Sequence, residues 1–276
     1  MKLGLNGATI MPADLRTDIS VAAAAGYDLL EIRDAKLDAF LEQGGTVAEL
    51  AERLAAARLA PLSINALEGV PDRSSGVTPE LRDRCARLAE IGGQIGARWI
   101  VAVPGTRAPE LEPAAAIAAA VRAVDELAGV VAAQGLGLAY EFIGRAGSAV
   151  PTLADALAVL DQVRPEVGLV LDTFHFSAGG SALADVERIP AERLAVLHIN
   201  DVEDRPAAEL TDAHRLYPGE GVLPLGQIFI RLRQTGFTGP ASVEVFRPEY
   251  WARDPGRVAR EAHAASVGAL QEGGLW

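Results

Sequence analysis

The fold of this chain can be inferred from one segment, Gly168-Leu169-Val170-Leu171-Asp172-Thr173-Phe174-His175-Phe176. The segment begins as a continuous aliphatic run, which is typical of a strand buried on both faces, as in a parallel sheet. The run ends in Asp172, and His175 follows three residues later. A buried strand has no structural use for an ionised carboxylate at its tip unless another group pairs with it. Asp172 therefore either caps the following helix or turn, or belongs to a site of chemistry at the end of a strand.

The same alternation of a short apolar run and a longer segment rich in Ala, Leu, Glu and Arg continues along the whole chain. It predicts strands at residues 3–5, 27–32, 61–66, 98–103, 136–142, 168–172, 194–199 and 241–246. It predicts helices at residues 14–25, 47–59, 79–95, 113–134, 153–163, 181–189, 225–234 and 255–270. Strands that alternate with helices in this way close most simply into a (β/α)8 TIM barrel. We expect residues 1–276 to form a single TIM-barrel domain.

A doubly wound open sheet is the alternative architecture. Such a sheet usually carries a glycine-rich phosphate-binding turn after its first strand. Here the first strand is followed by Asn6-Gly7-Ala8-Thr9-Ile10, which is not that motif. The one long irregular connection, residues 200–224, is of a length that usually indicates either a functional loop or a disordered one.

The composition narrows the classes of partner. The 276 residues are 50% hydrophobic, which is enough for a sizeable core. The net charge of -12 repels phosphate backbones, so we expect no nucleic-acid partner and no membrane. The single cysteine, Cys85, excludes an internal disulfide and lies in a helical pattern, where a buried structural thiol is expected. We find no leader peptide and no apolar run of transmembrane length, so we expect a cytoplasmic protein. A homo-oligomer remains open.

Four successive predicted strands end in residues that bind metal ions. In chain order these are Glu141, Asp172, His198 and Glu244. The carboxyl ends of the strands of a barrel meet at one mouth. Three carboxylates and one imidazole suit Mn²⁺, Mg²⁺ or Co²⁺, with Zn²⁺ also open, and without a cation the carboxylates would repel one another. Four unrelated caps would require the same coincidence on four strands, so we predict one divalent metal ion held by this set.

Other polar residues lie at or beyond the predicted strand ends: Glu31, Arg33, Asn65, Glu68, His175, Arg215 and Arg247. We expect His175 and Arg215 to contact a substrate, because Arg215 lies in the long connection and can reach back over the mouth. Asn65, Glu68 and Arg247 have equally good structural and substrate-binding interpretations. Glu31 and Arg33, at the end of the second strand, can simply pair with each other.

At these residues the sequence resembles the xylose-isomerase-like barrel superfamily of sugar phosphate isomerases and epimerases, and within it the bacterial inosose isomerase family. The likeness spans nearly the whole chain. The segments that carry it include Glu31-Ile32-Arg33, Asn65-Ala66-Leu67, Gly168-Leu169-Val170-Leu171-Asp172, Phe174-His175-Phe176 and Phe246-Arg247-Pro248-Glu249-Tyr250. The Glu/Asp/His/Glu set is common to the superfamily and identifies the metal site strongly but the substrate weakly.

The resemblance implies that Glu141, Asp172, His198 and Glu244 hold a divalent ion, most simply Mn²⁺. The activity expected from it is isomerisation of a small keto-polyol, such as 2-keto-myo-inositol, by proton transfer through an enediolate. We expect Glu141 and Glu244 to transfer the protons, and the substrate-binding candidates are His175, Arg215, Asn65 and Arg247. One residue departs from the family pattern, because Gly7 stands where an acidic side chain is expected.

The same ligand set also fits other activities. Dehydratases of the inosose or 3-dehydroshikimate type and ketose 3-epimerases resemble this sequence at the same residues, so the metal ligands do not discriminate among them. DNA-repair endonucleases also occur on this barrel, but they need several metal ions and a basic face, and this chain has four histidines and a net charge of -12. A ligand-binding protein with a vestigial metal site is a further alternative.

Overall fold

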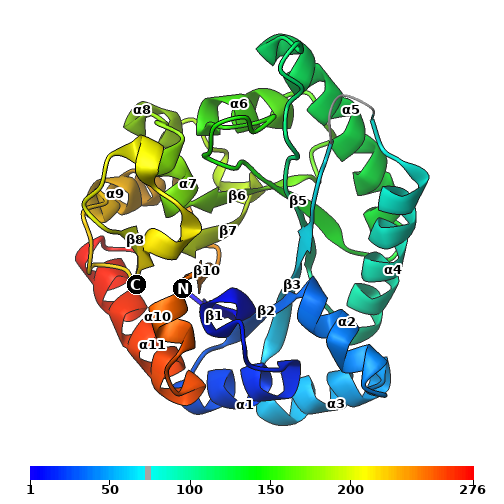
Figure 1. Ribbon diagram of the computed structural model, residues 1–276, viewed down its shortest axis with the longest axis vertical. Coiled ribbons are helices and arrows are strands. Elements are labelled where there is room, and N and C mark those ends of the chain that lie inside the picture. Colours follow the sequence, from blue (N-terminus) through cyan, green and yellow to red (C-terminus); the bar gives the residue numbers. More distant parts are fainter. Residues whose placement is uncertain (72–75) are drawn as a thin grey trace.

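The structure, a computed structural model, describes residues 1–71 and 76–276. At its centre eight parallel strands form a closed barrel, in the order β1-β10-β7-β6-β5-β4-β3-β2 (Figure 1). The barrel strands are β1 (Leu3–Asn6), β2 (Leu29–Arg33), β3 (Ala60–Leu67), β4 (Trp99–Ala102), β5 (Gly137–Glu141), β6 (Gly168–Asp172), β7 (Leu194–Ile199) and β10 (Ala241–Val243). The first and last strands of the barrel pair directly, with Leu3 opposite Ala241. The predicted (β/α)8 TIM barrel is therefore confirmed.

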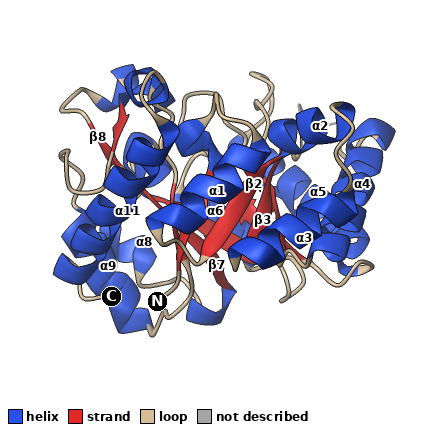
Figure 2. Cartoon of the chain, turned by 90° about the horizontal axis from the view of Figure 1, so that it is seen from below, coloured by secondary structure: helices blue, strands red, loops and turns tan. Residues whose placement is uncertain are grey.

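Helices form a ring around the strands, and the side view has them on the outside of the red barrel (Figure 2). They are α1 (Leu15–Ala25), α2 (Asp34–Glu42), α3 (Val47–Ala57), α4 (Pro79–Ile95), α5 (Pro113–Ala132), α6 (Leu153–Leu160), α7 (Thr173–Ala178), α8 (Leu183–Val186), α9 (Leu225–Thr235), α10 (Pro248–Trp251) and α11 (Pro255–Glu272). The short 3₁₀ helices are η1 (Gly7–Ile10), η2 (Ala191–Arg193), η3 (Ala207–Glu209) and η4 (Asp212–His214). No helix in the described part of the chain has both the length and the apolar character needed to cross a membrane.

Local sequence signals explain where several helices begin and end. The side chains of Asp14, Thr46 and Thr78 accept a hydrogen bond from the backbone three residues on, which satisfies an amide that the helix leaves free. Gly26 and Gly96 end α1 and α4 with φ angles of 91° and 78°, a left-handed conformation that favours glycine. These boundaries agree closely with the predicted ones.

The prediction was wrong at several connections. A second helix, α2, follows β2 directly, and it was missed because its buried face includes Lys36 beside Leu37 and Phe40, which masks the apolar pattern. The helix predicted at residues 181–189 is reduced to the four residues of α8, and α7 instead begins immediately after β6. The long connection is not wholly irregular, because β8 (Asp201–Val202) and β9 (Arg215–Leu216) form a small antiparallel pair outside the barrel (Figure 2).

The interior of the barrel is apolar below its mouth. One buried cluster contains residues from six of the strands: Leu29, Leu62, Ala66, Val101, Ala139, Val170, Ala195 and Val196. Because successive side chains of a strand point to opposite faces, the residue two positions further on points into the same interior. Leu29, Ala139, Val170 and Val196 are each followed at that spacing by an ionisable residue. The alternation therefore directs a ring of polar groups into the mouth.

A buried ion pair holds the segment that follows β1. Lys36 Nζ lies 2.7 and 2.8 Å from the two carboxylate oxygens of Asp18, and it also donates to the carbonyls of Gly7 and Ile10. A Cβ atom on Gly7 would lie only 2.7 Å from Asp18 Oδ2. The acidic side chain expected at position 7 would therefore collide with a carboxylate that is already buried there.

Breaking this pair should destabilise the fold. Lys36→Met leaves the Asp18 carboxylate buried without its cation, and we expect it to lower the free energy of unfolding by about 3–5 kcal/mol. The double variant Lys36→Met/Asp18→Leu removes both charges and should recover much of that loss. Urea unfolding of the two single variants and the double variant measures this coupling, and strictly additive effects would contradict it.

Candidate metal centre and active site

Four strands bring their terminal ionisable residues to one point. Glu141 ends β5, Asp172 ends β6, His198 is the penultimate residue of β7, and Glu244 directly follows β10. One ligand atom from each of the four lies within 4.8 Å of the others, and all four residues are buried. The structure thus brings together the complete set of predicted metal ligands.

The imidazole of His198 lies at the centre of this set. Its Nδ1 atom is 3.2 Å from Glu141 Oε1, 3.4 Å from Glu244 Oε2 and 3.9 Å from Asp172 Oδ2. Its Nε2 atom faces the opposite way and lies 3.0 Å from Glu31 Oε1. The ring therefore has carboxylates at both nitrogens, and its two nitrogens are not equivalent.

Asp172 serves two purposes, because its oxygens have different partners. Oδ1 accepts a hydrogen bond from the backbone nitrogen of His175 and so caps α7. Oδ2 faces the cluster and accepts from Arg215 Nη1 at 2.7 Å and from Asn200 Nδ2 at 3.1 Å. Both interpretations of Asp172 are therefore compatible with its position at the end of the strand.

Glu244 is held by its neighbours on both sides. Its Oε1 atom accepts from Asn6 Nδ2 at 3.0 Å, and its Oε2 atom lies 3.3 Å from Arg215 Nη1. The backbone around it is fixed by Thr9, whose hydroxyl donates to the carbonyl of Val243 and accepts from the nitrogen of Val245. The short η1 helix thus fixes the position of Glu244 although it was not predicted.

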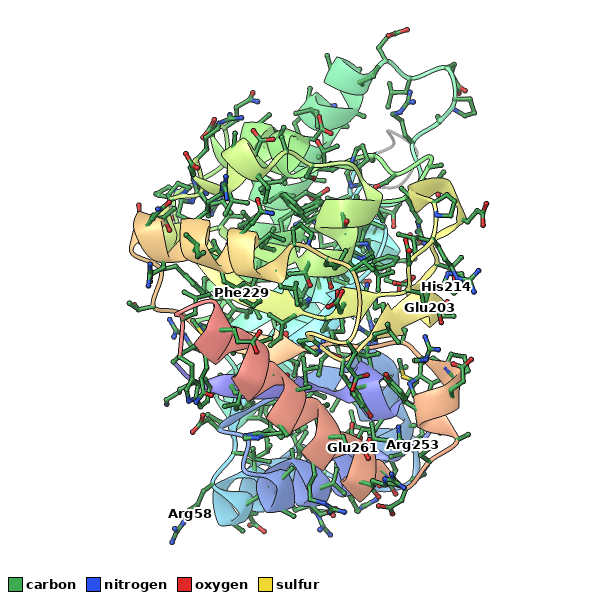
Figure 3. The ribbon with its side chains drawn as sticks, turned by 90° about the vertical axis from the view of Figure 1, so that its left-hand side faces the viewer. Arg58, Glu203, His214, Phe229, Arg253 and Glu261 are labelled. Carbon is green, nitrogen blue, oxygen red and sulfur yellow. The ribbon has the colours of Figure 1, made fainter. Side chains whose placement is uncertain are left out.

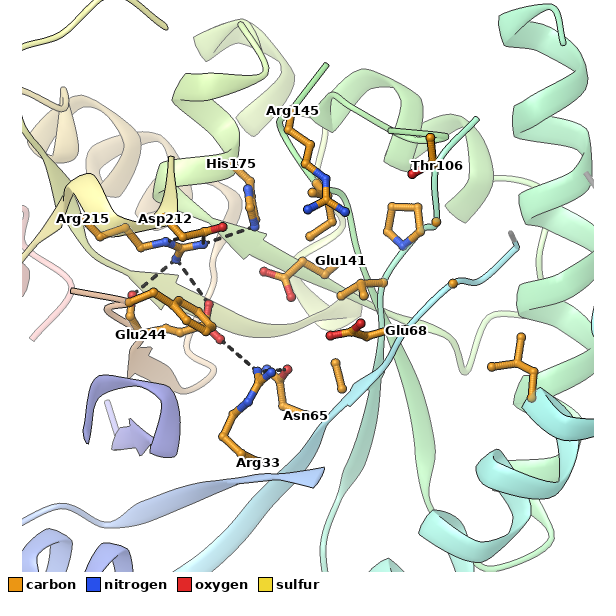
Figure 4. A pocket seen from close by; sticks show the side chains of 18 of the residues that line it. Arg33, Asn65, Glu68, Thr106, Glu141, Arg145, His175, Asp212, Arg215 and Glu244 are labelled. Carbon is orange, nitrogen blue, oxygen red and sulfur yellow. Dashed lines mark hydrogen bonds and ion pairs between the residues drawn. The ribbon is translucent and has the colours of Figure 1, made fainter. Parts of the chain in front are cut away.

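Arg215 reaches the mouth from the long connection, as expected. Its side chain is only 1% exposed and lies beside Asp172, Glu244 and Asp212, while its Nη2 atom is 3.2 Å from His175 Nε2 (Figure 4). An arginine always donates, so Nε2 of His175 accepts and its proton lies on Nδ1. That Nδ1 atom is buried and has no partner within residues 1–71 and 76–276, so it is a free donor.

A cavity of about 560 Å³ opens above the cluster. Glu141, His175, Arg215 and Glu244 line its inner part, and Figure 4 shows these side chains converging on it. Residues of the neighbouring loops, which include Glu68, Thr106 and Arg145, line the rest. The wall is mostly polar and charged, which suits a hydroxylated ligand rather than an apolar one.

Asn65 and Arg33 meet at the cavity wall. Arg33 Nη1 donates to Asn65 Oδ1 at 2.8 Å and lies 3.7 Å from Glu244 Oε1. The Asn65 Nδ2 atom is buried and has no partner in the described part of the chain. The sequence left open a simple pairing of Arg33 with Glu31, but in the structure Arg33 contacts Asn65 and Glu244, and Glu31 contacts His198.

Arg247 does not line the cavity, and its contact with substrate stays a prediction. It pairs with Glu203 at 2.8 Å and with Glu249 at 3.4 Å, and it lies over the ring of Tyr250. Figure 3 places Glu203 beside His214, at the turn of the long connection. Arg247 therefore links α10 to the segment that carries Arg215.

Glu31 is the site residue whose role the sequence did not predict. It is fully buried on β2 and contacts the far nitrogen of His198. The available signal was its position two residues after Leu29, which directs it into the barrel. What the sequence could not supply was its distance from a histidine 167 positions away.

Burial and charge shift the pKa values of the cluster in opposite directions. Burial raises the pKa of Glu244 to about 8, although His198 and Arg215 oppose the shift. For His198 burial lowers the pKa, but the charges of Glu31, Glu244 and Glu141 outweigh it and raise the pKa well above its usual value. For Asp172 burial is outweighed by Arg215, which holds the pKa below its usual range. At pH 7 Glu244 and His198 therefore both favour their protonated forms.

The donor set fits a divalent cation. Three carboxylates gathered in a buried site repel one another, and this repulsion favours their protonated forms. A bound cation offsets the repulsion and displaces the protons. Oxygen-rich ligands with one imidazole are typical of Mn²⁺, Co²⁺ and Zn²⁺ sites.

Metal binding should release protons and tighten as the pH rises. Glu244, with its pKa raised to about 8, and His198, with its raised pKa, carry protons at pH 7 that a cation must displace. We expect the apparent affinity for Mn²⁺ to increase from pH 6.5 to pH 8.5. Calorimetric titrations in buffers of different ionisation enthalpy count the protons released, and equal affinities with no release would contradict this assignment.

Known proteins resemble the chain over most of its length. A model of the family described as "Xylose isomerase-like TIM barrel" matches residues 19–266. Inosose isomerase of Halalkalibacterium halodurans is 34% identical over 254 residues, which cover 91% of this chain and 90% of that protein. Inosose isomerase of Bacillus velezensis is 32% identical over 273 residues, which cover 97% of each chain. A crystal structure of the IOLI protein with a bound zinc atom aligns over 99% of each chain, with a TM-score of 0.94 and 31% sequence identity.

Proposed function

Because the chain belongs to the xylose isomerase-like TIM barrel family, we propose that it is a divalent-metal-dependent isomerase of a keto-polyol such as 2-keto-myo-inositol. The observation that carries the proposal is the position of Glu141 and Glu244. Both are ligand candidates, and both also line the cavity, so a carbon atom bound beside the ion lies within reach of two carboxylates. The inosose isomerases among the relatives support the choice of substrate class.

The proposed cofactor is one divalent ion, with Mn²⁺ preferred because three of the four ligands are carboxylates. The zinc in the related IOLI structure supports Zn²⁺ as an alternative occupant. When bound, such an ion supplies Lewis-acid stabilisation of the negative charge that develops on a ketone oxygen and the neighbouring hydroxyl, worth several kcal/mol.

The chain's own carboxylates move the protons. In the proposed reaction one glutamate removes the proton from the carbon next to the ketone, which leaves an enediolate. A proton is then returned to the former carbonyl carbon, and the hydroxyl proton moves to the other oxygen, so the substrate and product are isomers. Glu244 suits this exchange because it lines the cavity, and because a bound cation displaces the proton that burial holds on it and so leaves a carboxylate that can accept one.

Three polar side chains are proposed to orient the substrate. His175 Nδ1 and Asn65 Nδ2 are buried donors that have no partner in the described residues, and both residues line the cavity. Arg215 supplies a fixed positive charge above the cluster, since its neighbours Asp172 and Asp212 raise its already high pKa despite burial. Hydroxyl and carbonyl oxygens of a polyol are the natural acceptors for these groups.

A neutral ligand fits this cavity better than a phosphorylated one. Two of the arginines in its wall, Arg33 and Arg215, already contact the carboxylate of Glu244. A phosphate group would also face Glu68, Glu141 and Asp212 across the cavity. We therefore propose an unphosphorylated keto-polyol.

The reaction can be followed in D₂O. The protein is loaded with Mn²⁺, mixed with 2-keto-myo-inositol and, after removal of the ion, the products are identified by proton NMR. Deuterium at the carbon next to the ketone together with a new inosose isomer is the expected result. Exchange followed by loss of water would identify a dehydratase instead, and an active protein that acts only on free ketoses would be a 3-epimerase. Metal binding without any exchange would contradict the proposed substrate.

Removing the proposed proton-transfer carboxylate should stop the exchange. We expect Glu244→Gln to reduce the exchange rate by about 10²–10⁴-fold, which is the usual contribution of a positioned acid or base. The assay uses saturating Mn²⁺ and a parallel measurement of bound metal, because Glu244 is also a ligand candidate. Glu52→Gln on the exposed surface of α3 removes the same charge far from the mouth and serves as the control. Near-normal turnover of Glu244→Gln would refute its role.

A further inference from the structure

A fourth carboxylate, Glu31, lies at the candidate metal centre but outside its ligand set. Its side chain is fully buried, and its Oε1 atom is 3.0 Å from His198 Nε2. The three carboxylate ligand candidates all lie on the other side of the ring, around Nδ1. The imidazole ring lies between Glu31 and these carboxylates, so Glu31 does not reach an ion that they hold.

The two sides of the ring determine where its proton belongs. A neutral imidazole has one N–H donor and one acceptor nitrogen, and only the acceptor nitrogen can bind a metal ion. Nδ1 faces the carboxylates of Glu141, Asp172 and Glu244, so it is the nitrogen available to an ion. When an ion takes the place of the proton on Nδ1, the remaining proton of the ring lies on Nε2, where Glu31 accepts it.

Glu31 is itself held firmly in place. Its Oε2 atom accepts from Ser63 Oγ at 2.7 Å, and its Oε1 atom accepts from Asn6 Nδ2 at 3.3 Å. Asn6 and Ser63 stand next to Glu31 in the registers of β1 and β3, so three adjacent strands fix one carboxylate. The same Asn6 amide also donates to Glu244. Asn6 therefore positions one ligand candidate, Glu244, directly and a second, His198, through Glu31.

We propose that Glu31 is the positioning residue of the metal centre, and that it fixes His198 in the tautomer that presents Nδ1 to the ion. This role rests on the metal site of the proposed function but not on the identity of the substrate. A carboxylate behind a metal-binding histidine orients the ring and increases its basicity, and loss of such a partner typically weakens metal binding about 10–100-fold.

Metal affinity tests this role without any substrate. The dissociation constants of Zn²⁺ and Mn²⁺ are measured by chelator competition for the wild-type chain and for Glu31→Ala and Glu31→Gln. We expect Glu31→Ala to bind about 10–100-fold more weakly. Glu31→Gln should lose less, because its amide oxygen still accepts the proton of His198 Nε2. Circular dichroism and thermal melting in chelator show whether each variant is folded.

Two variants serve as controls. Glu68→Gln removes a carboxylate from the wall of the same cavity without touching His198, so it reports the effect of lost charge alone. Ser63→Ala removes one hydrogen bond to Glu31 but leaves its carboxylate. Its affinity should fall between those of Glu31→Ala and the wild type, whereas Glu68→Gln should stay close to the wild type.

Nitrogen-15 NMR of the zinc-loaded protein gives a second, structural readout. Two-bond proton–nitrogen correlations of the His198 ring should show zinc on Nδ1 and the proton on Nε2, in both the wild type and Glu31→Gln. Zinc on Nε2 would overturn the proposal, as would a folded Glu31→Ala variant with wild-type affinity. Neither result would touch the isomerase activity, which the exchange assay in D₂O measures separately.

Discussion

The mouth of this barrel depends on the compensation of buried negative charge. Glu31, Glu141, Asp172 and Glu244 are all 3% exposed or less. Removing a carboxylate from water costs several kcal/mol unless another charge or a set of hydrogen bonds replaces the water. His198 stands between the four acids, and two of them, Asp172 and Glu244, also contact Arg215. A divalent ion would complete the same compensation, so one arrangement serves both stability and binding.

Part of that compensation comes from outside the barrel. Arg215 belongs to the long connection after β7, and this segment is ordered by Asp201, whose carboxylate accepts from the backbone nitrogens of Val202, Gly219 and Leu223. Tyr217 of the same segment stacks on Tyr250 of α10, with ring centroids 4.0 Å apart. The connection is therefore a structured wall of the site, which explains why a barrel strand order alone does not describe the active centre.

The sequence predicted the ligand set because each ligand has a local signal. A β-strand alternates its faces, so an ionisable residue two positions after a buried aliphatic residue points to the same interior, as Asp172 does after Val170. Residues that act through distant partners had no such signal. The contact of Glu31 with His198 was not predicted, and α2 was missed because Lys36 is buried in its apolar face. Arg247 pairs with Glu203 and does not line the cavity.

The sequence by itself determined the succession of strands and helices, hence the barrel, and the four residue types at its mouth. These depend on local periodicity and on helix caps, which neighbouring residues specify. Only the tertiary structure decided which nitrogen of His198 faces the ligands, which acids share Arg215, and that Asp18 fills the space beside Gly7. These contacts join residues that are far apart in the chain, and their distances are set by the closure and register of the barrel rather than by any local pattern.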